Sequence, residues 1–310
     1  MSLNAQDLAR NLVALASAPN FEGTGVYFLE ERDGDLVQTE YVEEGPIGTE
    51  YVCSGVKPNT PARYYVSGSQ GEQRTIVYVD DSGTLVAIAY DLGEGEWFSN
   101  PMDGVSSGVS IHPSSQLSGF ANSFMTVVAY QELSGQLGMI IQQDGEWYLA
   151  SPIPARFHPG APHATCEANG KMHVFYYASD HGIVHLARDY MTKQWETTIV
   201  SNSTFDVLPT RLMAIPIDGQ DQFDIYVLHQ SRLVCLAPGG DRVEHGVVKD
   251  GVLIPSTAAQ CRPRVRYRYG GSPCYGGNVT INITIIASTI GSNINWSDEV
   301  RKALPRGRLV

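Results

Sequence analysis

Residues 75–97 read TIVYVDDSGTLVAIAYDLGEGEW, which is two apolar runs separated by a short polar segment and followed by a tryptophan. β-Branched and aromatic residues dominate the first run, and Asp, Ser and Gly lie between the two. This composition is typical of two antiparallel strands joined by a tight turn. The stretch therefore predicts a β-hairpin that leads to Trp97.

The same arrangement recurs along the chain. Trp147 and Trp195 follow Trp97 at steps of 50 and 48 residues, and similar hairpins begin at Gly25, Thr75, Thr126, His173 and Asp224. A further short strand precedes each hairpin, and a repeat of about 50 residues with several strands is in the propeller range. We expect residues 1–310 to form one all-β domain, a six-bladed antiparallel propeller. A five-bladed propeller with an irregular closure of about 30 C-terminal residues is the alternative.

The repeat is least clear at the two ends of the chain. Residues 8–17, LARNLVALAS, are assigned to the first strand of the first repeat, although their local propensity favours a helix. The sixth repeat is compressed and runs from Asn278 to Trp296.

The charge balance excludes some functions. The 310 residues include 33 acidic and 21 basic side chains, a net charge of −12, which argues against a general binder of nucleic acid or of anionic membranes. No apolar run reaches the length of about 18 residues that a membrane-spanning helix needs. Arg10 and Asn11 interrupt the apolar N-terminal stretch, so we expect a cytoplasmic protein, or a secreted one if a signal has been removed.

The five cysteines form no CxxC pair, and no metal or cofactor motif is present, so we expect neither a metal nor a cofactor. The sequence does not decide whether Cys261 and Cys274 form a disulfide, or whether the protein is a homodimer. GVSSG at residues 104–108 matches a hydrolase motif, but it lies between strands rather than at a strand-to-helix elbow.

The order of strands, turn and tryptophan in each repeat resembles the fungal fucose-specific lectins. The resemblance implies a six-bladed propeller with sugar sites between blades, each using an Arg before a V-Y pair, a Glu in the next strand and nearby aromatic rings. The Arg position here reads Gly25, Ile76, Val127, His173, Asp224 and Asn282, and the Glu position reads Gln38, Ala87, Met139, His185 and Cys235. No repeat has both residues at these positions, so we do not expect fucose binding by the family mechanism.

His173 and His185 replace the Arg and the Glu within one repeat. On adjacent strands they would be close enough to share a ligand. The alternative is two half-buried imidazoles bonded to the backbone, and two His are too few for a metal site without a third ligand.

Arginine recurs in the strand assigned as innermost. Arg10, Arg63 and Arg211 occupy one repeat position, where Ser118, Ala164 and Thr257 stand in the other repeats. If this position faces the central channel, the guanidinium groups favour a carboxylate, phenolate or enolate ligand. The alternative is that they face a neighbouring blade or the rim and pair with acidic side chains.

A second basic feature is CRPRVRYRYGG, in which arginines alternate with other residues. One strand would place all of them on one face as an anion-binding surface, or as a charged edge that resists aggregation. These arginines are Arg262, Arg264, Arg266 and Arg268.

Two functions follow from these observations. The first is a lectin-like protein that binds a small molecule or glycan in an interblade or channel pocket. The second is an enzyme without a recognisable motif, a cyclase or isomerase such as those of fungal secondary metabolism, in which His and Arg polarise a positioned substrate. The fold alone does not choose between them.

Overall fold

The computed structural model describes the chain in segments. These are residues 2–3, 5–19, 25–42, 45–56, 60–67, 73–105, 108–122, 124–178, 182–217, 221–249, 252–256, 262–263, 265–266 and 286–287.

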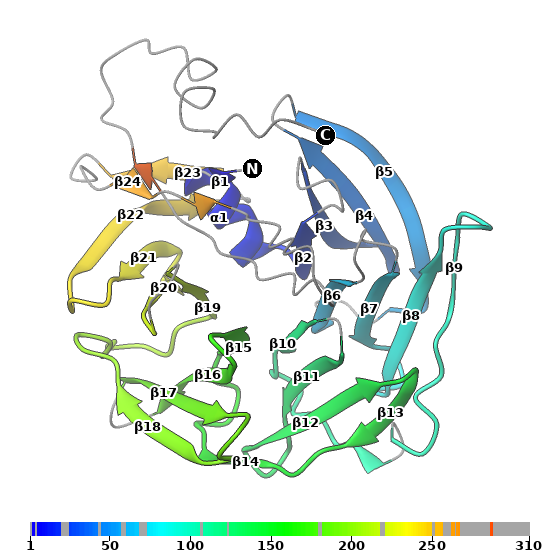
Figure 1. The fold of residues 1–310 in the computed structure, drawn as a ribbon. Coiled ribbons are helices and arrows are strands. Elements are labelled where there is room, and N and C mark those ends of the chain that lie inside the picture. The colour runs from blue at the N-terminus through cyan, green and yellow to red at the C-terminus, as the bar shows by residue number, and fades with distance from the viewer. Residues whose placement is uncertain are drawn as a thin grey trace, which may run out of the picture.

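Five antiparallel sheets stand around a central channel like the blades of a propeller (Figure 1). Blade 1 consists of β2 (Ala16–Pro19), β3 (Gly25–Arg32), β4 (Asp35–Val42) and β5 (Gly45–Ser54). Blade 2 consists of β6 (Ala62–Ser67), β7 (Gln73–Val79), β8 (Leu85–Asp91) and β9 (Glu96–Ser99). Blade 3 consists of β10 (Ser118–Ala121), β11 (Thr126–Gln131), β12 (Gln136–Gln143) and β13 (Glu146–Leu149), and β14 (Ile153–Arg156) also pairs with β12.

Blade 4 consists of β15 (His163–Ala168), β16 (Lys171–Ala178), β17 (Gly182–Asp189) and β18 (Trp195–Ile199). Blade 5 consists of β19 (Arg211–Pro216), β20 (Phe223–His229), β21 (Arg232–Leu236), β22 (Arg242–Lys249) and β23 (Val252–Pro255). Four short strands lie outside the blades and form two pairs: β1 (Ser2–Leu3) with β25 (Val265–Arg266), and β24 (Arg262–Pro263) with β26 (Ile286–Ala287).

The propeller prediction is confirmed, and the five blades of the described residues agree with the five-bladed alternative. The expected sixth repeat, Asn278 to Trp296, lies outside the described residues except for β26.

The hairpins form because the turns between strands suit a left-handed backbone. Asp33–Gly34, Asp144–Gly145 and Asn169–Gly170 each have positive φ at both residues. Two-residue hairpin turns of this type match the right-handed twist of the strands, and Asp, Asn and Gly adopt them most readily. The polar segments seen in the sequence are therefore the hairpin turns of the blades.

The core lies between blades rather than at the centre of the ring. In β7 six of seven residues are buried, whereas the outer strands β9 and β18 are mostly exposed. A middle strand is covered on both faces because its sheet packs against a neighbouring blade on each side, which explains its continuous apolar run. Trp97, Trp147 and Trp195 stand at the starts of outer strands and pack into these interblade clusters.

The helix α1 (Ala5–Val13) fills the wedge between blade 5 and blade 1 (Figure 1). Leu8, Ala9 and Leu12 are buried in a cluster with residues of both blades. The side-chain oxygen Oε1 of Gln6 accepts a hydrogen bond of 2.7 Å from the backbone N–H of Leu253 in β23. The N-terminal segment therefore links the first blade to the last one.

The assignment of residues 8–17 to an inner strand is wrong for most of that range. The local helix propensity prevails because the apolar residues Leu8, Ala9 and Leu12 recur at the spacing of one helix face. β2 begins only at Ala16 and supplies the inner strand of blade 1. None of the described helices is long and apolar enough to cross a bilayer.

Candidate functional site: the central channel

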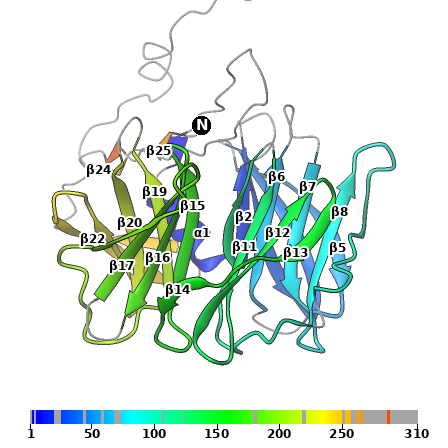
Figure 2. The ribbon, with the colours of Figure 1, turned by 60° about the horizontal axis from the view of Figure 1, so that its bottom comes forward.

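The inner strands of all five blades and the end of α1 enclose a cavity of about 580 Å³. Volumes of this size are typical of small-molecule sites. The strands run between the two ends of the ring, so successive residues of an inner strand lie at successive depths of the channel (Figure 2). Among the described lining residues, the charged side chains are Arg63, Glu167 and Arg211.

Arg63 on β6 is half-buried in the channel wall. Its Nη2 donates to the backbone oxygen of Gly119 at 3.1 Å, and its guanidinium lies 5.8 Å from the centre of the Tyr65 ring. Its Nε is buried without a hydrogen-bond partner in the described part of the chain. An unpaired buried donor costs free energy.

The backbone at position 119 on β10, in the channel wall, can accommodate only glycine. Its φ is +149°, and a Cβ atom there would lie 1.8 Å from the carbonyl oxygen of Val127. Only glycine allows the two strands to approach this closely. The same close approach presents the Gly119 carbonyl to Arg63.

Arg211 on β19 also lines the channel, and its Nη1 donates to the backbone oxygen of Thr210 at 3.3 Å. Burial lowers the pKa of its guanidinium. No carboxylate of the described residues forms an ion pair with Arg211 or with Arg63.

The cavity lining includes two of the three arginines of the predicted row, Arg63 on β6 and Arg211 on β19. Arg10 is not among the lining residues, because it lies on α1 with its guanidinium 5.0 Å from the centre of the Tyr41 ring.

A small polar network also lines the channel. The Oγ of Ser118 is 2.7 Å from Nδ1 of His163, and it donates to Oγ1 of Thr165 at 3.0 Å. Burial lowers the pKa of His163 to about 4, against a smaller opposing effect of a hydrogen bond to the Gln116 backbone, so the imidazole is neutral near pH 7. The Oδ1 of Asn11, another lining residue, is buried without a hydrogen-bond partner in the described part of the chain.

Glu167 supplies the carboxyl group of the described channel lining. Oε2 of Glu167 accepts a hydrogen bond of 2.5 Å from Nδ2 of Asn122. Burial raises the pKa of Glu167, and the Asn122 hydrogen bond opposes this shift. The neighbouring Cys166 remains a thiol, because burial raises its pKa to about 12.

A second arginine cluster, which sequence reasoning missed, lies between blades 1 and 2. The guanidinium of Arg74 lies 3.4 Å from the centre of the Tyr90 ring, and its Nη1 is 3.8 Å from Oε2 of Glu50. Gln38 donates to Glu50 and accepts 2.7 Å from the hydroxyl of Tyr64.

The repeat alignment placed Ile76 at the Arg position, but the arginine is two residues earlier on the same strand face. Its carboxylate partner, Glu50, belongs to the preceding blade, so no pattern within one repeat could reveal the pair. Arg74 is only 8% exposed and is covered by its own neighbours, which fits an interblade packing role.

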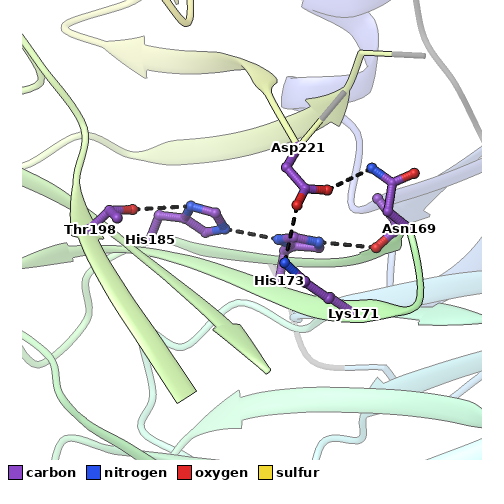
Figure 3. Close-up of polar contacts among 7 residues, drawn as sticks. Asn169, Lys171, His173, His185, Thr198 and Asp221 are labelled. Atoms are coloured by element: carbon purple, nitrogen blue, oxygen red, sulfur yellow. Dashed lines mark hydrogen bonds and ion pairs between the residues drawn. The ribbon is translucent and has the colours of Figure 1, made fainter. Parts of the chain in front are cut away.

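His173 and His185 do lie together, as expected, with Nδ1 and Nε2 2.9 Å apart (Figure 3). The remaining nitrogens also have protein partners, since His173 Nε2 is 3.1 Å from the Ala168 oxygen and His185 Nδ1 is 3.3 Å from Thr198 Oγ1. Phe175 stacks on His185 at 4.3 Å. This pattern agrees with the alternative of imidazoles bonded to the protein itself.

The charged groups beside the histidine pair also have partners within the protein. Nζ of Lys171 is 3.1 Å from Oδ2 of Asp221, and Nδ2 of Asn169 donates to Oδ1 of Asp221 at 2.7 Å (Figure 3). Burial, followed by the proximity of His173, lowers the pKa of His185 to about 4. In the described ranges no group of three His, Cys, Asp or Glu could hold a metal ion.

Of the predicted arginine strand near the C-terminus, the structure describes two arginines. Arg262 pairs with Ala287 in one two-stranded sheet, and Arg266 pairs with Ser2 in another. Arg264 and Arg268 lie outside the described residues, as do Cys261 and Cys274.

The chain is similar in fold to several solved structures, lectins among them. AofleA from Arthrobotrys oligospora is 14% identical, with 91% of this chain and 90% of that chain covered at a TM-score of 0.60. A lectin from Aleuria aurantia, described as a six-bladed β-propeller with a novel fucose recognition mode, is 18% identical, with coverage of 86% and 93% and a TM-score of 0.55. The lectin SapL1 in complex with α-methyl fucoside is 13% identical, with coverage of 88% and 98% and a TM-score of 0.58.

No protein-family model and no curated protein matches the sequence. At these low identities the similarity establishes the architecture. The chain is an all-β propeller with the fold of these lectins.

Proposed function

We propose that the protein is a lectin-like binding protein that holds a glycan or a small polar molecule in its central channel. The observation that carries this proposal is the cavity of about 580 Å³, whose lining includes the polar side chains of Arg63, Arg211, Ser118, His163 and Asn11. A cavity of this size with a few polar groups in its lining is typical of a ligand site.

The similarity to lectins supports a hydroxyl-bearing ligand. The solved complex of SapL1 contains α-methyl fucoside. A channel with guanidinium, imidazole and amide groups offers the donors and acceptors that sugar hydroxyls need. We place the ligand of this chain in the channel rather than between blades, because the interblade arginine Arg74 is already stacked on Tyr90 and ion-paired with Glu50.

A glycan array and isothermal titration calorimetry with the array hits test the proposal. We expect a ligand whose affinity falls at least tenfold in an Arg63→Met variant. Arg32→Met is the matched surface control, because Arg32 is half exposed in a hydrogen-bonded pair with Glu30, and it should bind like the wild type.

Thermal unfolding of each variant separates lost binding from lost structure. Binding that survives Arg63→Met but disappears in a folded Arg74→Met variant would place the ligand between blades 1 and 2 and overturn the channel proposal.

A further inference from the structure

The charged side chains among the described residues that line the channel are Arg63, Arg211 and Glu167. Arg63 on β6 and Arg211 on β19 line the same cavity as Ser118 and His163, whose Oγ and Nδ1 are 2.7 Å apart. We call these four residues the arginine band.

Glu167 on β15 supplies the carboxyl group of the described channel lining. Its Oε2 accepts a hydrogen bond from Asn122, and it forms no ion pair with Arg63 or Arg211 in the described part of the chain. Glu167 therefore does not neutralise the arginine band.

The arginine band thus holds two guanidinium groups without an ion pair to any described carboxylate, in a protein with a net charge of −12. Other described arginines with an acidic neighbour do form such pairs, as Arg232 does with Glu244 at 2.8 Å. Positive charge inside a partly desolvated cavity is costly unless an anion compensates it. The imidazole of His163 contributes a neutral hydrogen-bonding group to the same band.

We propose that the arginine band binds the carboxylate of an organic acid or acidic sugar, with Arg63 and Arg211 as its cationic partners. This inference rests on the proposed function and specifies the chemical class of its ligand. A guanidinium presents parallel N–H donors that match the two oxygens of a carboxylate. The neutral Ser118–His163 pair and Asn11 then face the uncharged part of the ligand.

Matched ligand pairs that differ in charge alone test the inference by calorimetry at pH 7. The pairs are methyl β-D-glucuronide with methyl β-D-glucoside for a sugar source, and benzoate with benzamide for a non-sugar source. We expect at least one carboxylate to bind tenfold or more tightly than its neutral partner, and its affinity to fall as salt concentration rises. The pair that shows the larger preference identifies the source of the carboxylate.

Substitutions then test whether the preference for a carboxylate depends on the arginine band. Arg63→Gln and Arg211→Gln, singly and together, should reduce carboxylate affinity while binding of the neutral partner changes less than threefold. Arg232→Gln removes an exposed arginine outside the channel and should leave both affinities unchanged. If the double variant does not fold, the single Arg211→Gln variant supplies the same comparison, since the described contacts give its guanidinium only a local backbone bond.

Three outcomes would overturn the inference. They are equal affinity for both members of each pair, no binding of either carboxylate, and a preference that persists in a folded Arg63→Gln/Arg211→Gln variant. A neutral glycan that binds in the channel with no charge preference would refute the inference and leave the proposed function intact. Binding that no channel variant affects would refute both.

Discussion

Arg63 and Arg74 belong to the same blade and lie on neighbouring strands, yet their surroundings differ. Arg74 is buried between two blades, where Tyr90 covers its face and Glu50 lies 3.8 Å from Nη1. Arg63 borders the channel, donates to one carbonyl oxygen and leaves a buried Nε unpaired. The first guanidinium is stacked and ion-paired between blades, whereas the second belongs to a residue that lines the cavity and has no ion pair to a described carboxylate. The comparison separates an arginine that packs between blades from one at the channel by the groups that surround each guanidinium.

The largest expected effect concerns the strand contact beside Arg63. Gly119→Ala would place a methyl group 1.8 Å from the Val127 carbonyl oxygen, at a φ that alanine disfavours. We expect a loss of about 4 kcal/mol of unfolding free energy from overpacking and backbone strain. Urea denaturation measures it. Gly48→Ala on the exposed strand β5, where a Cβ meets nothing within 4 Å, is the control and should change stability little. Equal stability of the two variants would show that the channel wall tolerates a side chain at position 119.

Removing the interblade arginine comes next. Arg74→Met should cost about 3 kcal/mol, because it leaves Glu50 and Gln38 without the cation and removes the stacking on Tyr90. Arg32→Met, which breaks an exposed pair with Glu30, should cost less than about 1 kcal/mol. Chemical denaturation of both variants gives the difference, and similar costs would refute the structural role assigned to Arg74.

The channel histidine makes stability depend on pH. The pKa of His163 is lowered to about 4 by burial. Between pH 6.5 and 4 the unfolded state therefore binds more protons than the folded state, so stability falls as the pH falls through this window. For His163 alone we expect a loss of about 2 kcal/mol between pH 7 and pH 5.

His185 and His245, whose pKa values are also lowered to about 4, act in the same direction, as does His173, whose pKa burial lowers. Urea denaturation at both pH values tests this, and His163→Gln should remove a measurable part of the pH dependence. An unchanged pH dependence in that variant would show that His163 is not the buried neutral base described.

The smallest effect is expected for Arg63 itself. Arg63→Met removes one hydrogen bond to the Gly119 carbonyl and no ion pair to a described residue, so its unfolding free energy should stay within about 1 kcal/mol of the wild type. Thermal unfolding of the ligand-free protein checks this. A loss as large as that of Arg74→Met would make Arg63 a structural residue too and remove the contrast between the two regions.

Much of the architecture could be predicted from the repeat. The hairpins beginning at Gly25, Thr75, Thr126, His173 and Asp224 all form, because their alternation and turns act over a few residues. The helix at Ala5–Val13 was misassigned because the repeat pattern was extended over a segment whose own apolar spacing is helical. The blade arrangement then determined which face of that helix is buried.

The candidate site was predicted less completely. Arg63 and Arg211 could be placed near the channel because both lie at the start of a recognisable inner strand. The Ser118–His163 contact and the Arg74–Glu50 pair depend on side chains that neighbouring blades bring together. No local pattern contains that information.

The sequence by itself determined that this chain is a β-propeller of hairpin repeats, since strand, turn and tryptophan signals are local and recur at a near-constant step. Only the tertiary structure decided which arginine binds a neighbouring blade and which remains open, because that depends on the side chains that other blades bring to within a few ångströms. The physical reason is that burial and pairing are properties of an assembled ring, whereas strand formation is largely a property of a few consecutive residues.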